Sequence, residues 1–117
     1  MDWLLHITSE ASWQGDRDSA EAYTPPSLDN EGFIHCSTPQ QIERVANALF
    51  SRQPQLLLLV IDPRRLKASV VYEDCYAAGE AFPHLYGPLN LDAVRERLPL
   101  RPTAGGHFNT PPLPAID

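Results

Sequence analysis

The stretch GFIHCSTP, residues 32–39, decides how this chain is expected to fold. Phe33 to His35 form a short apolar strand, and Thr38 with Pro39 is typical of a helix start, as N-cap and first helical residue. His35, Cys36, Ser37 and Thr38 then lie beside the free amide groups of a helix N-terminus. The corner is therefore a candidate functional site. The alternative is structural: a buried Cys, a capping Thr and a hydrogen-bonded His.

Working outward, the pattern predicts the main helix over residues 39–50. Its apolar residues follow the spacing of one helix face: Ile42, Val45, Ala46, Leu49 and Phe50. Gln41 would complete a capping box with Thr38, and Pro54 stops the helix.

Short apolar segments elsewhere predict strands or extended pieces over residues 3–7, 22–24, 56–61, 70–72 and 95–100. We also expect a short helix capped by Thr8 or Ser9, a turn at residues 27–30 and one helical turn at residues 91–94 after Asn90. Without regular β-α alternation, these elements predict an α+β domain with a mostly antiparallel sheet.

The totals limit the classes of function. A chain of 117 residues holds one domain, which we expect over residues 1–100, followed by a proline-rich tail without a core over residues 101–117. A net charge of −6 argues against a nucleic-acid partner. The longest apolar run, residues 56–61, is far below the roughly 20 residues of a membrane span. No signal-peptide pattern is seen, so a cytoplasmic location is expected, with reduced thiols, although a Cys36–Cys75 pairing stays open.

Three of the four histidines, His6, His35 and His84, lie inside apolar segments. A buried imidazole is costly without partners, so convergence on one polar pocket would explain all three. The alternative is three separate core histidines bonded to backbone. Glu73 follows a strand and Tyr86 could stack on a flat ring, yet a solvated Glu and a core Tyr remain open.

A metal site is the rival hypothesis. The chain holds several zinc-ligand residues: His6, His35, Cys36, Cys75 and His84. None of them has the short spacing of a zinc motif, so no metal is expected. Cys36 is a weak candidate nucleophile, because adjacent strand residues point to opposite faces and His35 is poorly placed to activate it.

These motifs together resemble a family of short, mainly bacterial proteins catalogued as domain of unknown function nine-five-two. The resemblance rests on the His of LHIT (residues 5–8), GFIHCS (32–37), a Glu after the strand ending at Tyr72, and FPHLYGPL (82–89). It covers residues 1 to about 100. The fold of that family is similar to the ADP-ribosyltransferase superfamily, a split-sheet α+β fold whose cleft holds NAD.

The resemblance implies a small nucleotide ligand, with NAD as substrate, and roles for six residues. His6 would bind a ribose hydroxyl or the carboxamide, His35 and Ser37 would position the nicotinamide ribose, and Tyr86 would stack on the ring. Glu73 would stabilise the developing cation, and His84 would orient groups or move a proton. Two alternatives stay open: a non-catalytic module that binds a nucleotide or small metabolite, and a zinc-dependent hydrolase.

Overall fold

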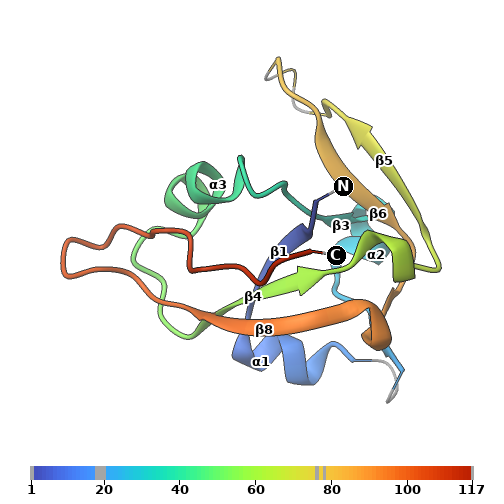
Figure 1. The fold of residues 1–117 in the computed structure, drawn as a ribbon. Helices are drawn as coiled ribbons and strands as arrows, with labels where there is room; N and C mark the ends of the chain where they lie inside the picture. The colour runs from blue at the N-terminus through green and yellow to red at the C-terminus, as the bar shows by residue number, and fades with distance from the viewer. Residues whose placement is uncertain (1, 18–20, 76, 78, 117) are drawn as a thin grey trace.

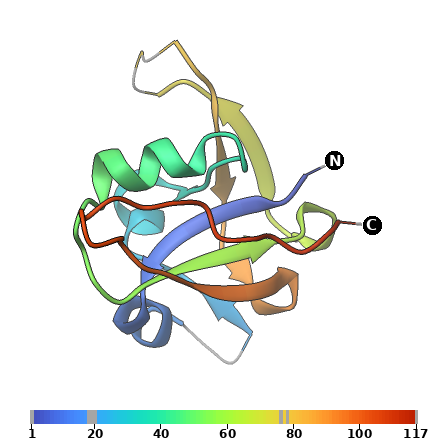
Figure 2. The ribbon, with the colours of Figure 1, turned by 60° about the vertical axis from the view of Figure 1, so that its left-hand side comes forward.

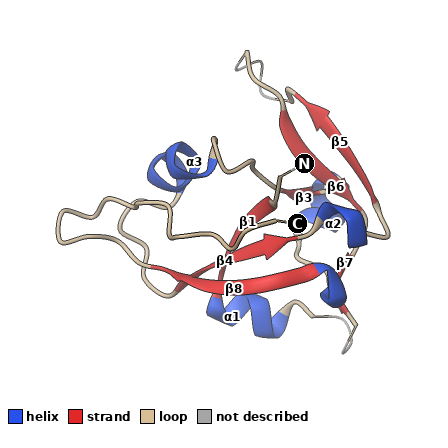
Figure 3. Ribbon diagram, in the orientation of Figure 1, coloured by secondary structure: helices blue, strands red, loops and turns tan. Residues whose placement is uncertain are grey.

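The computed structural model describes residues 2–17, 21–75, 77 and 79–116. Figures 1 and 3 show an α+β arrangement in which two three-stranded antiparallel sheets meet at an angle. The first sheet has the order β1-β4-β8, with β1 at Leu4–Ser9, β4 at Leu56–Ile61 and β8 at Val94–Leu100. The second has the order β3-β6-β5, with β3 at Ile34–His35, β6 at Phe82–Tyr86 and β5 at Ser69–Glu73.

Smaller elements connect these sheets. Strands β2 (Ala22–Tyr23) and β7 (Leu89–Asn90) form a two-stranded antiparallel pair. The helices are α1 (Glu10–Gly15), α2 (Ser27–Glu31) and α3 (Ile42–Leu49), with 3-10 turns η1 (Pro63–Arg65) and η2 (Leu91–Ala93). No helix in the described part of the chain is long and apolar enough to cross a membrane.

A short backbone bridge joins the two three-stranded sheets, which together form one split sheet. Leu5 N–H donates to Ser37 O at 2.8 Å, and Ser37 N–H donates to Leu5 O at 2.7 Å. Strand β1 therefore pairs with β4 along its whole length on one side and touches the segment after β3 at this bridge on the other.

Two apolar cores occupy the two faces of the β1-β4-β8 sheet. Leu5 and Ile7 point to one face and pack with Ile42 and Ala46 of α3. Leu4 points to the opposite face, where the core is completed by side chains from α1 and the second sheet, among them Trp13, Ile34 and Leu85. The alternation follows from the two-residue period of a strand.

Most of the expected elements are confirmed, including the main helix, the Ser9 cap of α1 and the buried central strand at residues 56–61. The helix begins later than expected, at Ile42. Residues 39–41 form a turn, and half of the capping box forms, since Gln41 Oε1 accepts the Thr38 N–H at 3.0 Å. The turn expected at residues 27–30 is instead the short helix α2, ended by Gly32 in the left-handed conformation.

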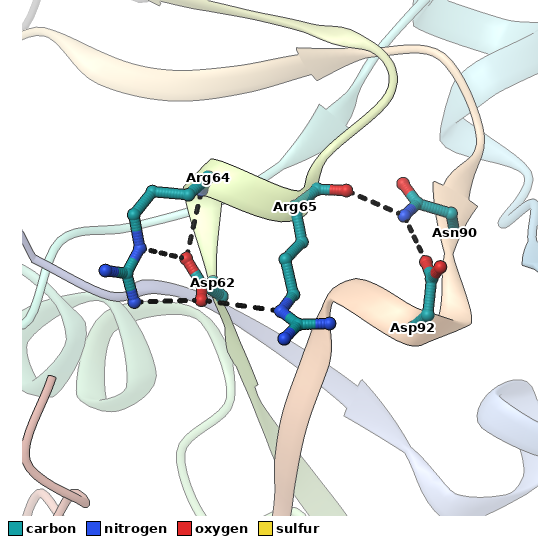
Figure 4. A network of polar contacts seen from close by, with 5 residues as sticks. All are labelled: Asp62, Arg64, Arg65, Asn90 and Asp92. Atoms are coloured by element: carbon teal, nitrogen blue, oxygen red, sulfur yellow. Dashed lines mark hydrogen bonds and ion pairs between the residues drawn. The ribbon is translucent and has the colours of Figure 1, made fainter. Parts of the chain in front are cut away.

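A polar network closes the end of the first sheet (Figure 4). Asp62 accepts two side-chain hydrogen bonds from Arg64, each 3.0 Å long, and the guanidinium of Arg64 holds the pKa of Asp62 below its usual value. Asn90 donates to Arg65 O at 2.9 Å and also contacts Asp92. These bonds hold η1 against β7 and η2, and no residue of the network lines the cavity described below.

The segment after β8 packs on the molecule, so the expectation that it lacks a core is wrong. Residues 101–116 form no helix or strand, as the prolines indicate, and they run back across the face that carries α3 (Figure 2). Phe108 is fully buried in the first core, and its backbone N–H and C=O both bond the Asn47 side chain, at 2.7 and 3.0 Å. A single buried aromatic ring has no periodicity, which is why the pattern does not reveal it.

We predict that Phe108→Ala lowers the free energy of unfolding by about 3–5 kcal/mol, the usual cost of emptying a buried Phe site. Leu49→Ala is the control, because this α3 side chain is 70% exposed. Chemical denaturation of both variants measures the difference. Equal stability of the two would show that the tail contributes nothing to the core.

Candidate functional site

A cavity of about 870 Å³ lies along β1, beside the bridge between the two sheets. Residues 5–9 of β1 and residues 35–37, which lead from β3 to the bridge, form one part of its wall, and α3 forms another. Pro25, Pro26 and Ser27, ahead of and at the start of α2, line it as well. The cavity therefore lies at the split, where the described part of the chain gives β1 an isolated bridge rather than a continuous neighbour.

A series of hydrogen-bonded polar side chains from β1 and β2, continued by a backbone carbonyl of β3, lies in the cavity wall. His6 Nδ1 is 2.6 Å from His35 O, and His6 Nε2 is 3.1 Å from the Tyr23 hydroxyl. The Tyr23 hydroxyl in turn contacts Thr8 Oγ1 at 3.0 Å. Because a carbonyl can only accept, Nδ1 carries a proton and donates it. The single proton of Tyr23 is then shared between two acceptors, His6 Nε2 and Thr8 Oγ1.

Burial determines the protonation states of His6 and Tyr23. Desolvation lowers the pKa of His6 from its usual 6.5 to about 4, so the imidazole is neutral at pH 7. Burial also raises the pKa of Tyr23 to about 12, which keeps its hydroxyl protonated. These side chains therefore form a neutral set of hydrogen-bond donors and acceptors, which suits the hydroxyl and amide groups of a ligand.

The rest of the cavity wall is mostly apolar. It includes Val45, Ala48 and Leu49 of α3 and the ring of Phe82 of β6. Cys36 also lines the cavity, but burial raises the pKa of its thiol to about 12, so it is a protonated thiol and a poor nucleophile. Arg44 is a cationic residue in the wall, and it already makes two hydrogen bonds to Glu80, at 2.8 and 2.9 Å.

A second polar group, the Glu73 cluster, is formed by Glu73, Cys75, His84 and Tyr86 on the β5-β6 hairpin. His84 Nδ1 is 2.9 Å from Glu73 Oε1, and the Tyr86 hydroxyl donates to the same oxygen. The pairing of Glu73 with Phe82 places alternate residues of β6 on the face that carries the carboxylate. Phe33 stacks on the buried His84 ring, with centroids 4.0 Å apart and planes 11° from parallel.

The charges in the Glu73 cluster differ from those in the cavity. The Tyr86 hydrogen bond, and then the bond to His84, hold the pKa of Glu73 below its usual value, so the carboxylate is ionised at pH 7. The same bond raises the pKa of Tyr86 to about 12. The cluster therefore presents a fixed negative charge that hydrogen bonds keep in place.

His35 joins the cavity to the Glu73 cluster. Its backbone carbonyl accepts the bond from His6, and its ring lies 5.5 Å from the ring of His84, in an edge-on arrangement. The His35 ring also bonds Glu31 at 2.9 Å. Together with Phe82, which lines the cavity and pairs with Glu73, His35 forms a wall that the two polar groups share.

The family model described as a protein of unknown function (DUF952) matches residues 7–97. The chain belongs to the DUF952 family. Among curated proteins, none matches.

Solved structures resemble this DUF952 chain throughout. Two crystal structures of protein CC0527 from Caulobacter crescentus, one of them a double mutant, are each 28% identical, with a TM-score of 0.76 over 92% of this chain and 93% of that one. The solution NMR structure of CC0527 is 29% identical, with a TM-score of 0.69 over 92% and 91%. The match supports the split α+β architecture seen here.

The structure distributes the six sequence-predicted site residues over two adjoining places. His6, His35 and Ser37 line the cavity, while Glu73, His84 and Tyr86 form the Glu73 cluster. The sequence motifs assign no role to Tyr23, Thr8 or the rings of Phe33 and Phe82. Tyr23 lies in a two-residue strand beside a pair of prolines, where nothing in the pattern indicates that it reaches His6. The two cysteines do not pair: Cys36 is buried, Cys75 is exposed, and both are free thiols.

We predict that DUF952 protein carrying His6→Gln loses less stability in acid than the parent. The folded pKa of about 4 lies below the usual 6.5, so the unfolded chain binds the extra proton first. The contribution of His6 is thus fully present above pH 6.5 and falls as the pH drops towards 4, by about 3 kcal/mol. Denaturant unfolding at several pH values measures it, with His107→Gln on the exposed tail as control. Parallel curves for the parent and His6→Gln would contradict the buried neutral imidazole.

We also predict that Tyr86→Phe raises the pKa of Glu73, because the largest contribution that lowers it is removed. The matched control is Tyr72→Phe, since Tyr72 is exposed on the same hairpin and pairs with Pro83 rather than lying on the Glu73 face. NMR titration of the Glu73 side-chain carboxyl reports both. An unchanged pKa in Tyr86→Phe would exclude the hydrogen bond as the cause.

Proposed function

We propose that the cavity binds NAD and that the Glu73 cluster assists cleavage of its nicotinamide–ribose bond, as in an ADP-ribosyltransferase-like enzyme. The observation that supports this most directly is the shared wall of His35 and Phe82 between a ligand-sized cavity and a fixed carboxylate. A volume of about 870 Å³ falls in the range of cofactor pockets.

In this proposal the cavity wall binds the ligand through neutral groups. His6 Nε2 accepts a hydrogen bond from a ribose hydroxyl or the carboxamide, while the Tyr23 proton turns to Thr8 Oγ1, which is already 3.0 Å away. The His35 carbonyl keeps Nδ1 protonated and thereby fixes the tautomer. Ser37 and the ring of His35 hold the nicotinamide ribose from the other side of the split.

The reaction requires negative charge near the ribose. The bond between C1′ and the nicotinamide nitrogen breaks, and nicotinamide leaves as a neutral molecule with the bonding electrons. The ribose then has oxocarbenium character, which an ionised carboxylate stabilises. Glu73 supplies this charge, with Tyr86 and His84 holding it in place. In the simplest case water attacks C1′ and releases one proton.

A non-catalytic binding module is the second candidate, and one observation favours it. Arg44, which would face the pyrophosphate of NAD, is paired with Glu80, and the wall from α3 is apolar. A small uncharged metabolite or a nucleoside would fill such a cavity without breaking that ion pair. Binding without turnover distinguishes this candidate from the first.

Calorimetric titration with NAD and a nicotinamide-release assay test the proposal together. We expect NAD to bind the parent protein and nicotinamide to be released. His35→Ala is expected to weaken binding with little loss of stability, because its side chain is 41% exposed. Glu73→Gln is expected to bind NAD and to release nicotinamide at least about a hundredfold more slowly.

Glu96→Gln, an exposed carboxylate on β8, serves as the control and is expected to match the parent. No heat and no shift in melting temperature with NAD would contradict the proposal. Binding with equal release by the parent and Glu73→Gln would remove Glu73 from the mechanism, and binding without any release would favour the second candidate.

A further inference from the structure

Three side chains of the Glu73 cluster bring together the donor atoms of a metal site. A carboxylate oxygen of Glu73, the Sγ of Cys75 and a ring nitrogen of His84 all lie within 4.8 Å of one another. Cys75 Sγ is 3.8 Å from His84 Nδ1, and Glu73 Oε1 is 2.9 Å from the same nitrogen. The three residues come from the end of β5, the turn after it and the middle of β6.

These separations fit a zinc ion. Zinc bonds of about 2.3 Å to sulfur and about 2.0–2.1 Å to nitrogen or oxygen, at tetrahedral angles, place sulfur and nitrogen roughly 3.6 Å apart and oxygen and nitrogen roughly 3.4 Å apart. The observed 3.8 Å and 2.9 Å each lie within about half an ångström of those values. The Glu73 side chain is partly exposed, so it has room to rotate.

The donor set and its surroundings also favour a cation. Thiolate, imidazole and carboxylate together suit zinc better than magnesium or calcium, which prefer oxygen ligands. Three acidic residues, Glu73, Asp74 and Glu31, also lie close enough to Cys75 to act on its thiol electrostatically. Their negative charges attract a divalent ion.

We propose that Glu73, Cys75 and His84 bind one Zn²⁺, with the remaining coordination position open to solvent on the exposed side of Cys75. Binding requires deprotonated ligands, so the Cys75 thiol proton passes to solvent. The proton on His84 Nδ1, which faces Glu73 before binding, leaves that nitrogen through the change of tautomer that a neutral imidazole allows. The ion thus replaces the Glu73–His84 hydrogen bond as the link between β5 and β6.

This inference does not depend on the proposed function, but it has a consequence for it. Zinc and an oxocarbenium-like ribose would compete for the same Glu73 carboxylate. If both proposals hold, zinc inhibits nicotinamide release. Metal binding is measured without NAD, so failure of one proposal leaves the other to be judged separately.

Titration of the chelator-treated full chain with Co²⁺ tests the site by absorption spectroscopy. We expect one equivalent to bind, with a thiolate-to-cobalt charge-transfer band in the near ultraviolet and the intense visible bands of tetrahedral cobalt. Zn²⁺ added afterwards is expected to remove both signals. The affinity for Zn²⁺ itself follows from competition with a chromophoric chelator.

Two ligand variants and one control separate the site from adventitious binding. Cys75→Ser should abolish the charge-transfer band and weaken zinc binding more than about tenfold, and Glu73→Gln should weaken it while leaving the band in place. His107→Gln removes an exposed histidine of the tail and should change nothing. Absence of the band in the parent, or equal zinc affinity in the parent and Cys75→Ser, would overturn the proposal. The position of Cys75 in an exposed turn makes the Ser variant safe for folding.

Discussion

The short backbone bridge between Leu5 and Ser37 is the constraint on which the rest of the structure depends. Two hydrogen bonds of 2.7 and 2.8 Å join two sheets that otherwise follow different directions. Among the described residues β1 has no further strand partner on that side, and its residues 5–9 line the cavity. An open strand edge is normally a liability, and here α3 and the segment before α2 cover it.

The two polar groups beside this split are stabilised in opposite ways. In the cavity wall, burial keeps His6 and Tyr23 neutral, and their hydrogen bonds satisfy groups that would otherwise be costly to bury. On the hairpin, Tyr86 and His84 keep Glu73 ionised at a more exposed position. A neutral binding surface next to a fixed charge is the arrangement expected where bonds to uncharged groups position a ligand and charge develops at one end of it.

Much of the fold could be predicted from the sequence because its periodic segments are strong. The run from Leu56 to Ile61 and the stripe from Ile42 to Phe50 bury continuous surfaces, and both were located correctly. Strand β6 was not predicted, because Pro83 and His84 interrupt the alternation of apolar and polar residues that indicates a strand. Phe108 also escaped prediction because a lone buried ring in an irregular tail leaves no pattern.

The candidate site was predictable only where motif and position coincide. The residues at the GFIHCS corner and in FPHLYGPL stand out, but nothing in their order shows that they divide into a cavity and an adjoining cluster. Zinc motifs are recognised by ligands that lie close together in one segment of the sequence. Glu73 and His84 instead meet across a hairpin, so the lack of such a motif gave no information on how these side chains lie. Tyr23 likewise reaches His6 through tertiary packing alone.

NMR mapping of NAD binding on the uniformly labelled chain tests most directly whether the cavity and the Glu73 cluster are one site. The account predicts that the amide signals of Thr8 and Ser37 in the cavity wall and of Glu73 on the hairpin shift together, with a single dissociation constant. Shifts confined to one of the two groups, or no shifts at either, would contradict it.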